Sequence, residues 1–218
     1  MNVFIIIPGH NEQEYVSTVL SKVKAIHSQV IFVDDGSTDN TAELAKAHTK
    51  HVLSHETNLG KGAALKTGCE YAFSTLNADA VIFMDADDQH DPKEIPKFIA
   101  QLENFDVVFG VRKMGANMPL SRFLGNKFAS VLLNVLYGGY IPDIPSGYKA
   151  LTSKGYRKVK WKSSGYEVET EIAMRVTKEH VPYAVIEIEA IYHDTDKGMT
   201  LIDGIHICRC LLEWKVGL

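Results

Sequence analysis

Apolar runs alternate with amphipathic stretches along the first half of the chain. Five runs, most of them rich in β-branched residues, predict strands over residues 2–8, 30–33, 51–53, 80–84 and 106–109. Apolar positions at helical spacing predict helices between them, over residues 12–26, 41–47, 62–76 and 94–102. The alternation predicts an α/β fold, in which a mainly parallel, Rossmann-like sheet carries helices on both faces.

The second half of the chain has a less regular pattern. It predicts helices over residues 120–137, 168–180 and 201–214, and a strand over residues 183–192. Residues 143–149 combine proline, glycine and polar positions, which is typical of a shaped loop. We find no repeat, low-complexity tract or linker in the sequence, so we expect a single domain over residues 1–218.

Composition narrows the classes of function. The 218 residues are 45% hydrophobic and 23% charged, as in ordinary soluble globular domains. A net charge of −4 gives no electrostatic reason to expect nucleic acid as a partner. Three cysteines argue against a disulfide framework and for a reducing compartment. The N-terminus does not read as a signal peptide, and no apolar stretch approaches the ~20 residues of a membrane-spanning helix, so we expect a cytoplasmic protein, peripheral on the membrane at most.

Polar turns follow four of the predicted strands, at residues 8–12, 34–37, 85–91 and 110–112. Ligands of open α/β sheets bind outside the carboxyl ends of the strands, so these turns should line one edge of the sheet. Their side chains are mostly acidic or able to form hydrogen bonds. We therefore expect a ligand site that is compatible with phosphate groups at this edge.

Four carboxylates crowd the third of these turns, and their repulsion calls for a balancing cation. Asp85 and Asp87 are two residues apart, so in extended backbone they point the same way. Oxygen ligands suit Mg2+ or Mn2+, which is usually shared with substrate phosphates. The alternative, an acidic turn before a helix, is the better account of Asp91 as N-cap and Pro92 as first helical residue. For Asp85 and Asp87 we favour metal or diphosphate binding.

Five short motifs occur in order along the chain. They are IIIPGHNE at residues 5–12, VDDGSTDNT at residues 33–41, NLGKG at residues 58–62, MDADDQHDP at residues 84–92 and SGYK at residues 146–149. Together they resemble family 2 glycosyltransferases of the GT-A fold, and most of all the dolichyl- and polyprenyl-phosphate mannosyl- and glucosyltransferases. The resemblance implies inverting transfer of a hexose from a nucleoside diphosphate sugar, of the GDP-mannose or UDP-glucose type, to a polyprenyl phosphate. Residues 1–112 would then form the nucleotide-sugar half and residues 113–218 the acceptor-side half.

The resemblance also assigns residues to the donor site. It implies that the nucleotide sugar contacts Pro8, Gly9, His10, Glu12, Asp34, Asp35, Lys61, Asp85 and Gln89. Asp85 and Asp87 match the DxD motif and would hold Mg2+ or Mn2+, with Asp87 taking part in catalysis. Many relatives have tyrosine in place of His10, but an imidazole can still stack on a base. Lys61 opens a helix and could serve an anion, or it could simply be a solvated lysine at a helix start.

Two arginines, Arg112 and Arg122, match arginines of the lipid-phosphate branch and are implied to be catalytic, because arginine forks suit phosphate oxygens. Surface or helix-capping arginines are the alternative. Ser146 matches a loop serine of the same branch on the acceptor side. Residues 193–200 depart from the arginine and glycine-serine-lysine order of the mannosyltransferases, and Lys197 is the residue that would supply the charge there.

The nature of the acceptor decides whether a protein base is needed. A phosphate monoester loses its second proton near pH 6 and is already a nucleophile at neutral pH. A carbohydrate hydroxyl would need a carboxylate base, for which Asp87, Asp88, Glu169 and Glu171 are the candidates. Glu169 and Glu171 are also explained as acids in the first turn of a helix. A nucleotide-binding subunit without transferase activity is a further alternative.

A basic segment, residues 154–162, carries five Lys or Arg side chains interleaved with Tyr156 and Trp161. Anionic lipid headgroups would attract such a segment, and tryptophan suits the membrane interface. A plain solvated basic face is the interpretation that we favour. A membrane surface or a membrane-protein partner therefore stays an open hypothesis.

Overall fold

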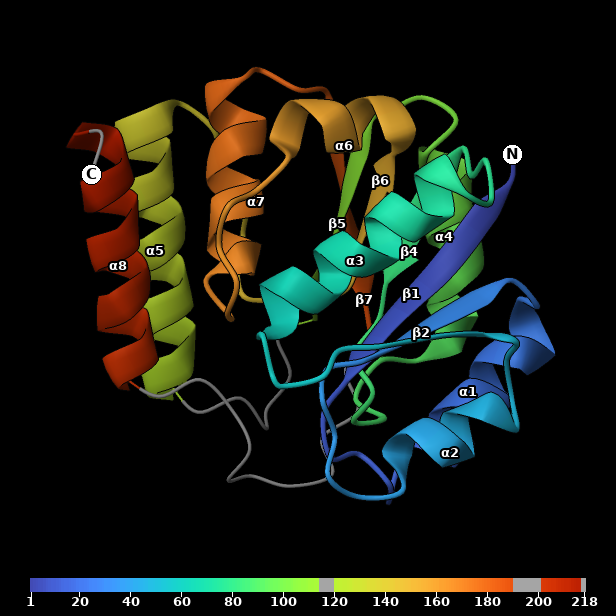
Figure 1. Ribbon diagram of the computed structural model, residues 1–218. Coiled ribbons are helices and arrows are strands. Elements are labelled where there is room, and N and C mark those ends of the chain that lie inside the picture. The colour runs from blue at the N-terminus through green and yellow to red at the C-terminus, as the bar shows by residue number, and fades with distance from the viewer. Residues whose placement is uncertain (114–119, 190–200, 217–218) are drawn as a thin grey trace.

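The computed structural model describes residues 1–113, 120–189 and 201–216. It is built around a single β-sheet (Figure 1). In this part of the chain seven strands lie in the order β3-β2-β1-β4-β6-β5-β7. They are β1 (Val3–Gly9), β2 (Val30–Asp34), β3 (His51–Ser54), β4 (Ala80–Phe83), β5 (Val107–Arg112), β6 (Lys149–Thr152) and β7 (Tyr183–Ile188). All pairings are parallel except those of β6, which runs antiparallel to both β4 and β5. The predicted mainly parallel sheet is confirmed.

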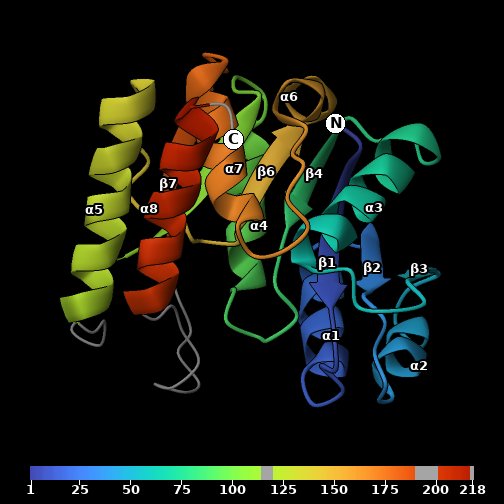
Figure 2. The ribbon, with the colours of Figure 1, turned by 60° about the vertical axis from the view of Figure 1, so that its left-hand side comes forward.

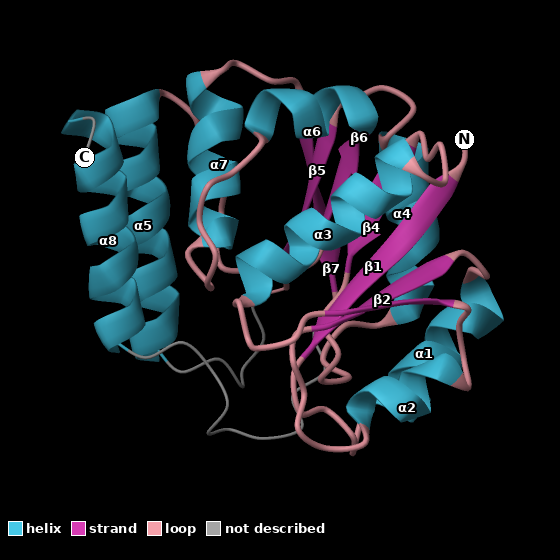
Figure 3. Ribbon diagram, in the orientation of Figure 1, coloured by secondary structure: helices cyan, strands magenta, loops and turns pink. Residues whose placement is uncertain are grey.

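Helices cover both faces of the sheet, as Figure 3 shows. One face packs against α1 (Val16–Ile26), α2 (Thr41–Lys46) and α4 (Ile95–Gln101), which the short 3-10 helix η1 (Pro92–Glu94) precedes. The other face packs against α3 (Lys61–Ser74), α5 (Leu120–Tyr137), α6 (Ser153–Val159), α7 (Val168–Lys178) and α8 (Leu201–Val216). Strand β1 alternates between the two cores: Ile5 and Ile7 enter the first, whereas Phe4 and Ile6 enter the second. Burial on both faces explains the continuous apolar run that this strand shows.

Two elements were not predicted, namely β6 and α6. Strand β6 has only four residues, begins with a lysine and is buried at its first three positions, so it lacks both length and alternation as signals. The predicted helix over residues 12–26 begins later, at Val16, and in the preceding turn the backbone N–H of Glu12 donates to the Thr41 hydroxyl. The strand predicted over residues 183–192 is observed to Ile188, and its last three residues lie outside the described chain.

Helices α5 and α8 pack side by side at one flank of the molecule (Figure 2). Four apolar side chains of α5, Leu124, Phe128, Val131 and Val135, remain 45–74% exposed. Their spacing of four, three and four residues places them along one stripe of the helix. We call this set the α5 stripe. Within the described chain, no helix is both long and apolar enough to cross a bilayer.

The basic segment at residues 154–162 does not offer aromatic rings to a membrane. Trp161 is 1% exposed and donates its indole N–H to the carbonyl of Gly62 at 2.8 Å. Tyr156 is also buried, in the same core. Lys154 and Lys160 pair with acidic side chains on neighbouring elements. The segment is therefore a solvated basic face over a core, and the interfacial role suggested for its tryptophan is wrong because that side chain is buried.

Candidate active site

A cleft of about 230 Å³ opens at the carboxyl ends of β1, β2 and β4. It is lined by Pro8, Gly9, His10, Glu12, Asp35, Asn58, Gly60, Lys61, Ala64, Asp85, Ala86, Asp87, Gly165 and Tyr166. Eight of these were predicted to contact the nucleotide sugar or the metal, and the structure brings them together from three of the predicted turns and the NLGKG segment. Asp34 and Gln89 do not line the cleft.

Asp34, the last residue of β2, and Asp35, which follows it, form different contacts. Asp35 accepts hydrogen bonds from the backbone N–H groups of Leu59 (3.0 Å) and Gly60 (2.8 Å), and His55 Nδ1 lies 2.7 Å from its Oδ1. It therefore fixes the loop that leads into α3. Asp34 is 4% exposed and accepts from the backbone N–H of Ser37 at 3.3 Å, so it closes its own turn.

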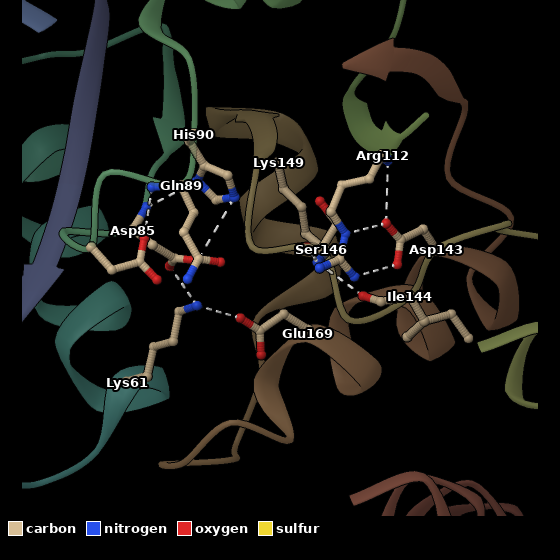
Figure 4. Close-up of polar contacts among 11 residues, drawn as sticks. Lys61, Asp85, Gln89, His90, Arg112, Asp143, Ile144, Ser146, Lys149 and Glu169 are labelled. Atoms are coloured by element: carbon tan, nitrogen blue, oxygen red, sulfur yellow. Dashed lines mark hydrogen bonds and ion pairs between the residues drawn. The ribbon is translucent and has the colours of Figure 1, made fainter. Parts of the chain in front are cut away.

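Lys61 lies between two carboxylates (Figure 4). Its Nζ is 2.6 Å from Asp85 Oδ1 and 2.7 Å from Glu169 Oε1, and its side chain is 13% exposed. Burial acts to lower the pKa of Lys61, but Asp85 and Glu169 outweigh it and raise the pKa above its ordinary value. The lysine is an ion-paired cation of the cleft, so the interpretation as a solvated helix-start lysine is wrong.

The DxD carboxylates differ in electrostatics. Burial acts to raise the pKa of Asp85, but Lys61 and His90 outweigh it and hold the pKa at about 2. Burial and the neighbouring Asp85 charge raise the pKa of Asp87. Asp85 is therefore a fixed anion, whereas Asp87 accepts a proton or a cation more readily.

His90 is buried and contacts the backbone of Asp85. Its Nδ1 accepts the backbone N–H of Asp85 at 3.1 Å, and its ring stacks on Tyr148 with centroids 4.7 Å apart. Burial lowers the pKa of His90 to about 4, so the ring is neutral at pH 7. No role for this histidine was predicted from the sequence, although it lies within the acidic motif.

Other acids near the cleft are committed to structural contacts. Asp88 accepts two hydrogen bonds from Lys22 Nζ, at 2.7 and 2.8 Å, and Asp91 caps η1 through the backbone N–H of Lys93. Glu171 binds the backbone N–H groups of residues 162 and 163 and the Arg175 side chain. Glu169, in contrast, reaches Lys61. Of the two glutamates that the sequence left open, Glu169 is the one beside the cleft.

A second polar cluster lies next to the cleft, on the other side of Figure 4. Arg112 forms a bidentate ion pair with Asp143, with Nε to Oδ2 at 2.7 Å and an Nη to Oδ1 at 2.8 Å. Asn126 of α5 donates to the same carboxylate at 3.0 Å. Ser146 is 3% exposed, and its Oγ has no hydrogen-bond partner within the described chain. We call Arg112, Asp143, Asn126 and Ser146 the arginine cluster.

Gly147 joins the two clusters. A Cβ atom at this position would lie 2.5 Å from Asp85 Oδ2, so a larger residue would displace the Asp85 carboxylate from its contact with the 143–147 loop. Two further predicted residues cannot be placed. The side chain of Arg122 and all of Lys197 lie outside the described residues.

The oxygen ligands of the cleft suit a cation that substrate phosphates also bind, rather than a cation enclosed by protein ligands alone. No group of three or more His, Cys, Asp or Glu side chains is arranged to hold a metal within the described chain. Asp85 and Asp87 supply hard oxygen ligands from two side chains. Mg2+ is commonly held by one or two carboxylates together with substrate phosphates, and these residues fit that pattern.

Comparison with known proteins establishes the family. The sequence pattern of glycosyl transferase family 2 matches residues 4–166. The chain belongs to this family. Our glycosyltransferase is 29% identical to a UDP-N-acetylglucosamine–dolichyl-phosphate N-acetylglucosaminyltransferase of Methanococcus voltae, over 99% of this chain and 96% of the relative. It is 26% identical to an undecaprenyl-phosphate mannosyltransferase of Micrococcus luteus, over 94% of this chain and 88% of the relative.

The glycosyltransferase also shares its fold with a solved structure. Glucosyl-3-phosphoglycerate synthase of Mycobacterium tuberculosis, in complex with Mn2+, UDP and phosphoglyceric acid, aligns with a TM-score of 0.74 at 21% identity. The alignment covers 100% of this chain and 79% of that one. The GT-A fold predicted from the motifs is confirmed.

Sequence reasoning missed several residues of this glycosyltransferase site. Tyr166 is 81% exposed and lines the cleft, with Lys61 Nζ 5.7 Å from its ring centre. It reaches the cleft from a loop far along the chain, and no local pattern marks it. Lys149 is 1% exposed and lies between the two clusters in Figure 4. Its place in the SGYK motif was the available signal.

Proposed function

We propose that this family 2 glycosyltransferase moves a hexose from a nucleoside diphosphate sugar, of the GDP-mannose or UDP-glucose type, to a polyprenyl phosphate with inversion. The observation that supports this proposal is the partly buried ion pair of Arg112 and Asp143 beside the DxD cleft, whose loop also contacts the cleft through Gly147. Asp143 engages the Nε and one Nη of Arg112, so the other N–H groups of the guanidinium are the ones that would donate to phosphate oxygens. The names of the two relatives, which state dolichyl and undecaprenyl phosphate as acceptors, support the same acceptor class.

The donor would lie in the 230 Å³ cleft. Asp85 and Asp87 would hold Mg2+ or Mn2+ against its diphosphate, and the bound cation stabilises the negative charge on the leaving nucleoside diphosphate. Lys61, already cationic in the cleft, is placed to add a further positive charge at the phosphates. His10 and the exposed ring of Tyr166 offer flat surfaces to the base or the sugar.

The acceptor phosphate would approach from the arginine cluster. Asp143 holds the Arg112 guanidinium in a fixed plane, and Ser146 offers a hydroxyl donor. Because a lipid phosphate is largely dianionic above pH 6, it attacks without a protein base. Catalysis then rests on positioning and charge stabilisation.

The α5 stripe gives the lipid tail a surface. It lies on the same helix as Asn126, which contacts Asp143 in the arginine cluster. We expect Phe128→Asp to reduce flotation of the protein with vesicles that contain polyprenyl phosphate. Ile26→Asp, at a similarly exposed apolar position on α1, serves as the control and should float as the wild type does. Equal flotation of both variants would contradict a role for the stripe.

The deciding assay follows radiolabel from GDP-mannose, UDP-glucose and UDP-N-acetylglucosamine into butanol-extractable lipid, with polyprenyl phosphate and Mg2+ or Mn2+ present. The proposal expects label that needs both the metal and Asp87. Asp87→Ala should abolish transfer, whereas Asp91→Asn, in the same loop but committed to capping η1, should retain it. Absence of lipid label from every donor, with nucleotide binding intact, would overturn the proposal.

A carbohydrate hydroxyl is the second candidate acceptor, and one observation favours it. Asp87 has a raised pKa and Glu169 lies beside the cleft, so carboxylates suited to a general base are present. Under this alternative Arg112→Ala would leave transfer to a sugar acceptor unchanged. Under the lipid-phosphate proposal the same variant loses most of its activity.

A further inference from the structure

Lys149 is a buried lysine that belongs neither to the donor cleft nor to the arginine cluster. It is the first residue of β6, paired in register with Phe83 on one side and Phe109 on the other. Its side chain is fully buried, and its Nζ lies 5.9 Å from the centre of the Phe109 ring. A buried ammonium is unfavourable unless neighbours stabilise it, so its place here needs a reason.

The partners of Lys149 are carbonyl groups of one loop. Its Nζ donates to the carbonyl of Ile144 at 3.2 Å and to that of Ser146 through a shorter contact. Neither partner is a carboxylate. The ammonium therefore acts as a cross-brace that fixes the direction of two peptide groups within residues 143–147.

That loop carries contacts to both halves of the site. Asp143 holds Arg112 at one end, and Gly147 lies against Asp85 at the other. Between them, Ser146 has a buried hydroxyl without a partner in the described chain. A shift of the two braced peptide groups, Ile144 and Ser146, would displace the Ser146 hydroxyl and the neighbouring Asp143 carboxylate together.

We propose that Lys149 is a positioning residue that holds the 143–147 loop so that Ser146 and the Asp143–Arg112 pair are presented to the acceptor phosphate. The inference rests on the lipid-phosphate acceptor of the proposed function. Holding this loop is a role that neither the DxD motif nor the arginines have.

The charges around Lys149 agree with this role. Burial lowers the pKa of Lys149 to about 8, and Lys61 acts in the same direction. Glu169, Asp143 and Asp85 oppose the lowering. The lysine is therefore charged at neutral pH and loses its charge in mildly alkaline solution.

The first test compares Lys149→Met, which has a similar length but no donor, with the exposed control Lys154→Met. We expect Lys149→Met to raise the KM for polyprenyl phosphate about tenfold, equivalent to ~1.4 kcal/mol. The affinity for UDP or GDP with Mn2+, measured by calorimetry, should change less than about threefold. Lys154→Met should match the wild type. An equal loss of donor and acceptor affinity, or an unchanged acceptor KM, would overturn the proposal.

A double-mutant cycle with Ser146→Ala separates positioning from general destabilisation. If Lys149 acts through Ser146, the double variant is no worse than Lys149→Met, because the hydroxyl is already misplaced. Additive losses in kcat/KM would overturn the proposal. If Lys149→Met does not fold, Lys149→Arg takes its place, since it keeps both charge and donors. It should preserve the acceptor KM at pH 7 and keep its acceptor affinity above pH 8, where we expect the wild type to lose affinity, and an equal loss in both proteins would overturn the proposal.

Hydrogen exchange tests the brace without any acceptor. Lys149→Met, or Lys149→Gln if the methionine variant does not fold, should speed amide exchange in residues 141–148 and leave α1 and α2 at wild-type rates. Unchanged exchange in residues 141–148 would overturn the inference. If the wild type transfers no sugar to lipid phosphate, the proposed function fails, while the exchange result still reports on Lys149.

Discussion

Removal of the Lys61 charge should destabilise the fold in a way that depends on pH. Lys61→Met leaves Asp85 and Glu169 without their shared cation, at 26% and 7% side-chain exposure. Loss of one partner of a buried ion pair costs about 3–5 kcal/mol. Because Asp85 keeps some exposure to water, we expect a loss near the lower end, about 3 kcal/mol at pH 7.5.

The pKa of Asp85 gives an independent magnitude. Its lowering from 3.8 to about 2 corresponds to roughly 2.5 kcal/mol of stability. A carboxyl with a lowered folded-state pKa contributes this stability above pH 3.8 and loses it as the pH falls toward 2. Without Lys61, burial is the main remaining effect and raises the pKa of Asp85. The penalty of Lys61→Met should therefore be largest at pH 7–8 and shrink toward pH 4, where the carboxyl takes up a proton.

Urea unfolding at pH 7.5 and pH 4.5 measures both quantities. Lys46→Met is a suitable control, because its pair with Glu43 lies on the surface with side-chain exposures of 55% and 74%. Such pairs contribute about 0–1 kcal/mol. A loss below about 1 kcal/mol for Lys61→Met at pH 7.5, or one that is equal at both pH values, would refute the reasoning.

Three further predictions concern the neighbours of the DxD motif. Gly147→Ala would place a Cβ 2.5 Å from Asp85 Oδ2, so Mn2+ binding followed by electron paramagnetic resonance should weaken at least tenfold, whereas Gly125→Ala, which meets nothing within 4 Å, should bind normally. The pKa of His90 is lowered to about 4, so the folded state becomes less stable as the pH falls from 6.5 toward 4, because the unfolded chain takes up the proton first. His90→Gln lacks this group, so over the same pH range its free energy of unfolding, measured by urea titration, should fall by about 3 kcal/mol less than that of the wild type. Asp143→Asn should release the arginine fork and raise the acceptor KM about tenfold in steady-state assays, with calorimetric nucleotide affinity unchanged.

The sequence was informative where burial and spacing are local properties. The strands β1, β2 and β4 are apolar runs buried on both faces, and the polar turns at their ends could only gather at one edge. The family resemblance assigned Lys61 and Asp85 to the same donor site, so the NLGKG and DxD segments were predictable as neighbours. Their ion pairing was not, because the second partner of Lys61 comes from α7.

Helix phase explains the ambiguity between the two glutamates. Glu169 and Glu171 are two residues apart on α7, so they point to different sides of the helix, and both are buried. Only the packing of α7 against the rest of the molecule decides that Glu169 meets Lys61 while Glu171 binds the loop before the helix. Lys149 was missed for a related reason: a lysine at the start of a four-residue strand resembles a surface position.

The place of β6 in the sheet has a consequence for how the molecule assembles. Strand β5 does not pair with β4, because β6, from later in the chain, lies between them with hydrogen bonds to both. A ribosome that has released only residues 1–112 therefore presents β5 without either of its strand neighbours, since β7 is also later. The sheet closes only after the chain has returned through the SGYK motif. We expect a fragment of residues 1–112 to leave one edge of β4 and both edges of β5 without strand partners.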